Sequence, residues 1–110
     1  MSEVVPTIST HVLDTGSGQP AVGVRVTLGR LLDDGALVPA GEARTDGDGR
    51  IRSLLVGELT SGDYVLAFHL DDHGRFFQRV TLEVHVDDPT RSYHVPLLLA
   101  PFGVSAYRGS

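Results

Sequence analysis

Glycine and proline are spread so evenly along this chain that little room is left between them for a long helix. Thirteen Gly and six Pro occur among 110 residues, and the longest stretch without either runs from Arg75 to Asp88. Within that stretch apolar and polar residues alternate with a period of two, which is typical of a half-buried β-strand. The spacing therefore argues against a helical bundle and favours a fold of short strands.

Other segments between the breakers show the same strand-like character. The expected strands are residues 8–14, 22–32, 36–40, a short one at 51–55, 63–70, 76–86, 91–99 and 103–107. Val22 is expected to face the core with Val24 and Val26, and residues 63–70 are expected to form a central strand because both of their faces are apolar. Pro96 cannot donate to a strand ladder, so it predicts a sheet edge or a bulge. Seven to eight strands in one domain, residues 1–110, predict an all-β Greek-key β-sandwich of immunoglobulin size.

The missing residue types exclude several classes of chemistry. There is no Cys, which excludes disulfides, thiolate metal sites and cysteine nucleophiles, and there is no Lys, which excludes Schiff-base chemistry and a Walker phosphate loop. The net charge is −5 with no basic run, so neither nucleic acid nor an anionic membrane is an expected partner. No signal-like N-terminus and no apolar run of about 20 residues is present, which favours a soluble cytoplasmic protein.

Histidine is the residue best suited to proton transfer near neutral pH among those that remain. His11 and His94 each lie within an expected strand, where each is either a surface or core histidine or a catalyst. His69, Asp71, Asp72 and His73 form the densest group of ligand-type residues, and they are either a metal site or, as we expect, a polar hairpin tip. The run Asp46-Gly47-Asp48-Gly49 lacks the ligand spacing of an EF-hand and is interpreted as a turn. No metal site is expected.

Four segments, in this order along the chain, resemble the transthyretin-like (prealbumin-like) family, and within it the 5-hydroxyisourate hydrolases. They are Ile8-Ser9-Thr10-His11-Val12-Leu13-Asp14, Thr45-Asp46-Gly47-Asp48-Gly49-Arg50, the run from Tyr93-His94-Val95-Pro96 to Gly103, and the closing Tyr107-Arg108-Gly109-Ser110. The closing segment typifies the hydrolases, whereas the hormone-carrying transthyretins lack it. The resemblance therefore favours the enzymes within the family.

The resemblance implies hydrolysis of 5-hydroxyisourate, a product of urate oxidation, to 2-oxo-4-hydroxy-4-carboxy-5-ureidoimidazoline in purine degradation. It implies catalytic roles for His11, Arg50 and His94, and a contribution to the substrate pocket from Tyr107, Arg108, Gly109 and Ser110. It also implies a homotetramer, formed as a dimer of dimers with the sites in a channel between them, and neither metal nor cofactor. Which histidine acts as the base is left open.

One segment departs from the family pattern. Residues 69–79 are several residues shorter than usual, and Gln78-Arg79 stands where the family has Pro-Glu after its two Phe residues, so the usual short helix is expected to be cut to a hairpin. This puts the local packing, the assembly and the substrate preference in question. The competing hypothesis is a non-catalytic carrier of small ligands on the same sandwich, because a fold does not fix a function.

Overall fold

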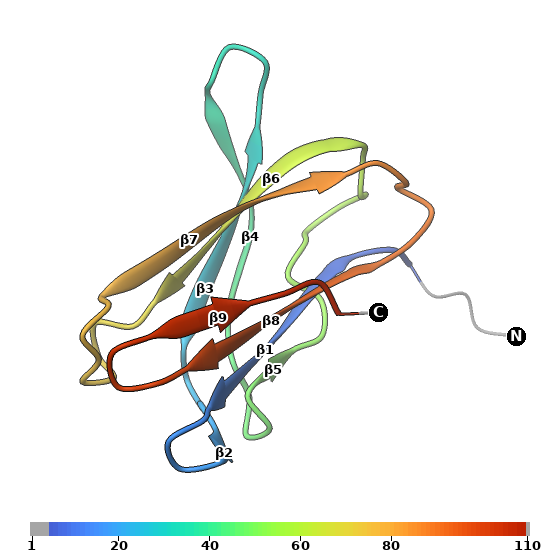
Figure 1. Cartoon of the computed structure of the whole chain (residues 1–110). Helices are drawn as coiled ribbons and strands as arrows, with labels where there is room; N and C mark the ends of the chain where they lie inside the picture. Colours follow the sequence, from blue (N-terminus) through green and yellow to red (C-terminus); the bar gives the residue numbers. More distant parts are fainter. Residues whose placement is uncertain (1–4, 110) are drawn as a thin grey trace, which may run out of the picture.

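In the computed structural model, which describes residues 5–109, the chain forms two stacked β-sheets and no helix within that range. The strands are β1 (Ile8–Asp14), β2 (Gln19–Pro20), β3 (Arg25–Leu31), β4 (Leu37–Arg44), β5 (Arg50–Ile51), β6 (Gly62–His69), β7 (Arg79–Val86), β8 (Tyr93–Leu99) and β9 (Val104–Ala106). Figure 1 shows the two sheets layered on each other, with the β3–β4 hairpin projecting from the sandwich. The all-β, transthyretin-like sandwich expected from the sequence is confirmed. There are nine strands and not seven to eight because the two-residue β2, Gln19–Pro20, was not expected from the sequence.

The two sheets differ in how their strands are connected. One sheet has the order β4-β3-β6-β7 and is antiparallel throughout, with β6 in its interior as expected. The other has the order β2-β1-β8-β9, and β5 also pairs with β1. In this second sheet β1 and β8 run parallel, with Ser9 opposite His94 and His11 opposite Pro96. Strands about 80 residues apart in the sequence are therefore direct neighbours, spaced about 4.8 Å apart.

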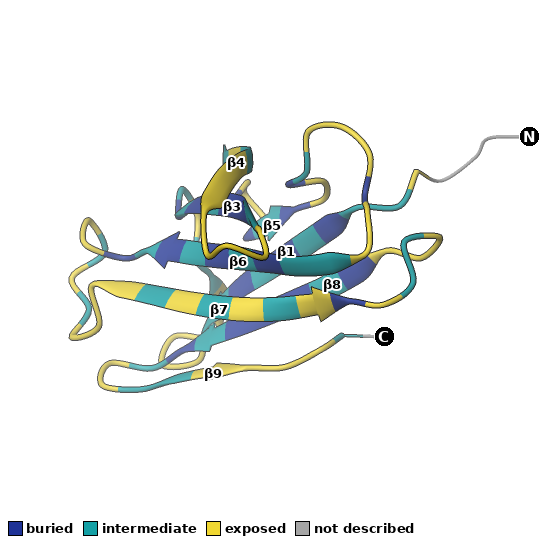
Figure 2. Cartoon of the chain, turned by 90° about the horizontal axis from the view of Figure 1, so that it is seen from above, coloured by how far each residue is buried: buried dark blue, intermediate teal, exposed yellow. Residues whose placement is uncertain are grey.

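The core lies between the sheets and follows from the alternation of apolar residues. In β1, Ile8, Thr10 and Val12 are fully buried while the residues between them are only partly covered. The alternating bands along β1 and β7 in Figure 2 show this period of two. The buried hydroxyl of Thr10 donates a hydrogen bond to the Val95 carbonyl, 2.6 Å away, which meets the requirement that a buried polar group be paired.

Three local predictions need correction. Val22 is 53% exposed because Gly23, with φ +78°, turns the chain before β3 begins. The strand expected at 51–55 ends at Ile51, although Leu54 is buried beyond it. Pro96 lies in an interior strand rather than at an edge. The Pro96 carbonyl accepts a hydrogen bond from Tyr107 N, so the Pro96 nitrogen also faces β9. Because that nitrogen has no hydrogen to donate, the β8–β9 ladder is interrupted there. The interruption lies between the Leu97–Ala106 and His94–Gly109 pairs.

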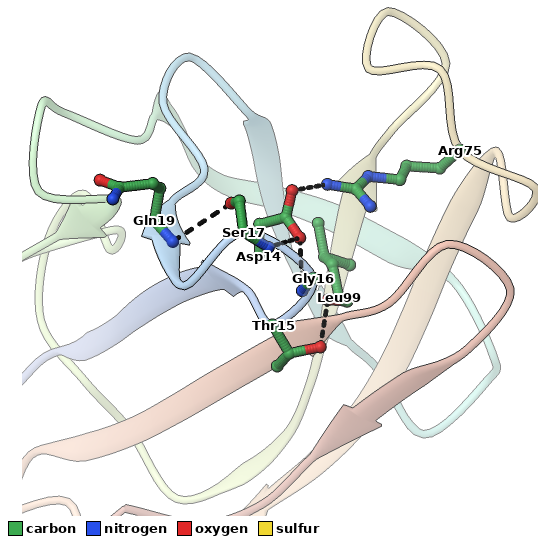
Figure 3. A network of polar contacts seen from close by, with 7 residues as sticks. All are labelled: Asp14, Thr15, Gly16, Ser17, Gln19, Arg75 and Leu99. Carbon is green, nitrogen blue, oxygen red and sulfur yellow. Dashed lines mark hydrogen bonds and ion pairs between the residues drawn. The ribbon is translucent and has the colours of Figure 1, made fainter.

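The shortened segment between β6 and β7 is a turn and an extended loop, as expected, rather than a helix. Arg75 in this loop reaches across to the β1–β2 turn and forms an ion pair with Asp14 (Figure 3). The other oxygen of that carboxylate accepts from Gly16 N at 2.9 Å, which holds the β1–β2 turn itself. A single carboxylate therefore fixes two loops at one end of the sandwich. Residues 5–109 contain no helix long and apolar enough to cross a membrane.

Candidate active site

The three residues proposed for catalysis lie on the outer face of the sheet that contains β1. Ile8, Thr10 and Val12 point into the core, so Ser9 and His11 point outward. The same parity places His94 outward on β8 and Arg50 outward on β5. The strand register then makes His11 the direct partner of Arg50 on one side, and Ser9 the direct partner of His94 on the other. Four polar side chains from three strands thus share one face.

The turn before β5 positions Arg50. The Asp46 carboxylate accepts hydrogen bonds from the backbone N–H groups of Arg50 and Asp48, both at 2.9 Å. These bonds hold the pKa of Asp46 below its usual value, the bond from Arg50 having the largest effect. Gly49 adopts φ +74°, and a Cβ on it would lie 2.5 Å from the Val12 carbonyl. Only glycine fits there, because the turn must both reverse direction and touch β1.

His94 is held by a side chain of the neighbouring strand. Ser9 Oγ lies 2.8 Å from His94 Nδ1. Partial burial is the main cause that lowers the pKa of His94 below its usual value of 6.5, and the positive charges of Arg50 and His11 lower it further; a hydrogen bond with the Ser9 backbone acts in the opposite direction. The imidazole is therefore neutral at pH 7, and a neutral imidazole can accept a proton.

A small concavity of about 270 Å³ opens over these residues. It is lined by Ser9, Thr10, Arg50, Ile51, Arg52 and His94. His11 does not line this concavity, although it is adjacent to Arg50 in the sheet. A larger groove of about 620 Å³ lies on the other sheet, but its walls are mainly apolar and contain neither histidine nor arginine. Of these two hollows, only the smaller one is lined by a histidine and an arginine.

The residues near the C-terminus fall into two places. Gly109 is directly opposite His94, and its N–H donates to the His94 carbonyl at 2.8 Å. Tyr107 and Arg108 instead line a separate cleft of about 340 Å³ between β7 and the β8–β9 pair, where the Arg108 guanidinium stacks 4.9 Å from the centre of the Tyr93 ring. In a single chain, only Gly109 of these three contacts the catalytic candidates. Ser110 lies outside the described residues.

The other candidates from the sequence form no site. Residues 71–74 are a turn, as expected for a hairpin tip, and among residues 5–109 no group of three or more His, Asp or Glu is arranged to hold a metal ion. Sequence reasoning missed Ser9 and Arg52 as residues lining the site. Strand parity placed Ser9 on the face of His11, but its contact with His94 depends on a pairing between strands far apart in the chain.

The fold and site together define a transthyretin-like β-sandwich with a histidine–arginine cluster on one outer sheet face. Residues 8–109 match the model of the HIUase/Transthyretin family, and the chain belongs to that family. It is 43% identical to the 5-hydroxyisourate hydrolase of Deinococcus radiodurans, over 96% of this chain and 97% of that protein.

Solved structures agree with this membership. The chain is similar to the 5-hydroxyisourate hydrolase of Klebsiella pneumoniae, with a TM-score of 0.81 and 32% identity, covering 96% of this chain and 100% of the other. Sea bream transthyretin in complex with thyroxine has a TM-score of 0.85 at 22% identity, with 93% of each chain covered. That second likeness concerns the fold alone.

Proposed function

We propose that this protein hydrolyses 5-hydroxyisourate to 2-oxo-4-hydroxy-4-carboxy-5-ureidoimidazoline in purine degradation. The observation that carries the proposal is the convergence of His11, Arg50 and His94 on one sheet face from three separate strands. Relatives named 5-hydroxyisourate hydrolase, at 43% and 39% identity over nearly the full chain, support the same activity. A ligand carrier would not require two histidines and an arginine on a single sheet face.

The geometry suits water attack on a cyclic amide. Water oxygen adds to the ring carbonyl carbon while a histidine nitrogen takes one of its protons. The carbonyl oxygen becomes an oxyanion, and the planar guanidinium of Arg50 offers several N–H donors to stabilise that charge. When the ring carbon–nitrogen bond breaks, the departing nitrogen takes up a proton and the carbon is left as a carboxylate. No covalent intermediate with the protein is needed.

His94 suits the role of the base. Its lowered pKa keeps it neutral near pH 7, so one of its ring nitrogens is free to accept the proton of water. His11, next to Arg50, would protonate the departing nitrogen or orient the water. Gly109 contributes through its contact with His94, and Tyr107, Arg108 and Ser110 are proposed to complete the pocket once subunits assemble.

We also propose that the working protein is a homotetramer, a dimer of dimers. β7 and β9 are edge strands, each paired on one side only, and both lie along the same side of the molecule (Figure 2). Between them is a cleft lined partly by Leu82, Val84 and Val95. Open strand edges and apolar surface favour pairing with another copy. A second dimer facing the outer surface of β1 and β8 would then enclose His11 and His94 in a channel.

The decisive experiment is an enzyme assay on freshly generated 5-hydroxyisourate. Purified protein should accelerate the decay of the substrate's ultraviolet absorbance well beyond the spontaneous rate, and a chelator should leave the rate unchanged because no step uses a metal. A decay rate equal to that in buffer would refute the hydrolase and favour a carrier. A rate that falls with chelator would refute the metal-free mechanism.

A further inference from the structure

The His94 side chain is contacted on two sides, by Ser9, to which no role has been given, and by Gly109, whose contribution has not been specified. On one side, Ser9 Oγ lies 2.8 Å from Nδ1. Ser9 is the parallel-strand partner of His94, so the two outward side chains stand side by side on β1 and β8. A distance of 2.8 Å is that of a well-formed hydrogen bond. Nδ1 is therefore occupied by the protein, and Nε2 is the nitrogen left for a substrate or for water.

The other side of the ring is closed by backbone. A Cβ built on Gly109 would lie 2.6 Å from His94 Cδ2, which is closer than such atoms can approach, and 3.3 Å from Cγ, which is a tight contact. Gly109 N also donates to the His94 carbonyl at 2.8 Å, so β8 and the segment after β9 are fixed in this register. Gly109 is not in the positive-φ region, which means that the need for glycine here comes from the imidazole and not from the backbone.

We propose that Ser9 and Gly109 are positioning residues that hold the His94 imidazole between them, with Ser9 Oγ accepting the Nδ1–H proton so that bare Nε2 is the base. The catalytic part of this inference rests on the proposed hydrolase function. Ser9 is only partly buried, so its own hydroxyl proton can bond to water. A histidine whose second nitrogen is engaged in this way keeps one tautomer and one ring orientation.

The first test reads the tautomer directly and does not depend on activity. Nitrogen-15 NMR of histidine-labelled protein, above the pKa of His94, should show protonated Nδ1 and bare Nε2 in the wild type. Ser9→Ala should give a mixture of tautomers, whereas Ser9→Thr should restore the wild-type pattern because it keeps the hydroxyl on a β-favouring side chain. A mixed or Nε2-protonated His94 in the wild type, or a Ser9→Ala spectrum identical to the wild type, overturns the proposal.

The second test measures the consequence for turnover. Ser9→Ala should lower kcat by roughly 10- to 100-fold with little change in KM, the range seen when the second partner of a functional histidine is removed. Ser105→Ala is the control, on β9 of the same sheet. It removes a hydroxyl that has no hydrogen-bond partner among residues 5–109, and it should leave kcat unchanged. Equal losses in both variants would contradict a positioning role for Ser9.

A matched pair of glycine variants tests the contact between Gly109 and His94. Gly109→Ala should displace the imidazole, and so lower kcat and mix the His94 tautomers. Gly103→Ala should change neither, because its Cβ would approach no atom closer than 4.0 Å. A Gly109→Ala protein with wild-type tautomer and turnover overturns this half of the proposal. If the wild type fails to hydrolyse 5-hydroxyisourate, the NMR result still decides whether Ser9 and Gly109 hold the ring, so the two proposals fail separately.

Discussion

At the scale of single residues, the site depends on which nitrogen and which charge each side chain presents. His94 is neutral because burial and the neighbouring charges of Arg50 and His11 disfavour its protonated form. Arg50 presents a planar guanidinium with several N–H donors and needs only to be held in place. The same arginine that would stabilise an oxyanion thus also keeps the neighbouring histidine able to accept a proton.

Alanine substitutions should separate these residues from other histidines. His11→Ala, Arg50→Ala and His94→Ala are each expected to lower kcat/KM by roughly 10²-fold or more, through lost proton transfer or lost oxyanion stabilisation. His85→Ala is the control, because His85 is exposed on β7 of the other sheet and pairs only with Asp63. The measurement is the 5-hydroxyisourate assay at constant protein concentration. A loss for His85→Ala as large as that for His94→Ala would mean that the site has been assigned to the wrong sheet.

At the scale of elements, two short loops place the strands that carry the site. The turn at residues 45–49 fixes β5 against β1 through Gly49, whose carbonyl accepts from Val12 N at 2.8 Å. The loop between β6 and β7 is fixed to the β1–β2 turn through Arg75 and Asp14. A single carboxylate holds each of these loops, that of Asp46 in the first case and that of Asp14 in the second.

Asp46→Ala should lower turnover although the side chain does not line the concavity. Without the two bonds from the N–H groups of Asp48 and Arg50, the turn loosens and Arg50 moves away from its position beside His11. A small misplacement of a catalytic group can cost up to about 10²-fold in rate, and we expect a smaller loss than for Arg50→Ala. Asp48→Ala is the control, because the Asp48 carboxylate accepts no hydrogen bond within residues 5–109. Comparable kinetics for the two variants would contradict the role given to Asp46.

The ion pair between Asp14 and Arg75 predicts a dependence of stability on pH. The hydrogen bond with Arg75 is the main cause that lowers the pKa of Asp14 in the folded protein. The ionised carboxylate therefore stabilises the fold at pH values above its unfolded-state pKa near 3.8. This stabilisation is lost as the pH falls through the lower pKa of the folded state. Asp14→Asn should therefore unfold at a lower urea concentration than the wild type at pH 7, and the difference should shrink towards about pH 2. Asp72→Asn, in the loop that carries Arg75, is the control. A difference between Asp14→Asn and the wild type that stays constant with pH would exclude the ion pair as its origin.

At the scale of the whole molecule, the outer face with His11 and His94 is open to solvent in one chain, which leaves the site shallow. Water screens the charge of Arg50 in an open site and much less in an enclosed one. The proposed tetramer would supply that enclosure. Such an enclosed channel would contain four residues of this face: His11, Arg50, His94 and Gly109.

Light scattering after gel filtration should give a mass of four chains. The shortened loop at residues 70–78 is held to the sandwich by Arg75, so its length should not prevent assembly. If the loop instead supports the channel, the protein will elute as a dimer or monomer and will be correspondingly inactive. A mass of one or two chains contradicts the tetramer, whatever the activity assay gives.

Much of this protein could be predicted from local sequence. The even spacing of Gly and Pro limited the elements to short strands, and a period of two put Ile8, Thr10 and Val12 on one face of their strand and His11 on the other. These properties depend only on neighbours in the chain, because strand parity is a property of the backbone itself. The roles of His11, Arg50 and His94 came from the resemblance to a family and not from spacing.

Tertiary structure alone decided how distant segments meet. The parallel pairing of β1 with β8 puts Ser9 beside His94, 85 residues away in the sequence. It also places Pro96, expected at a sheet edge or a bulge, in an interior strand. Tertiary structure also places Tyr107 and Arg108 in the cleft beside β7, while Gly109 pairs with His94. Local sequence determines which face of its own strand a residue occupies, but the neighbouring strand and its register follow from packing the whole core at once.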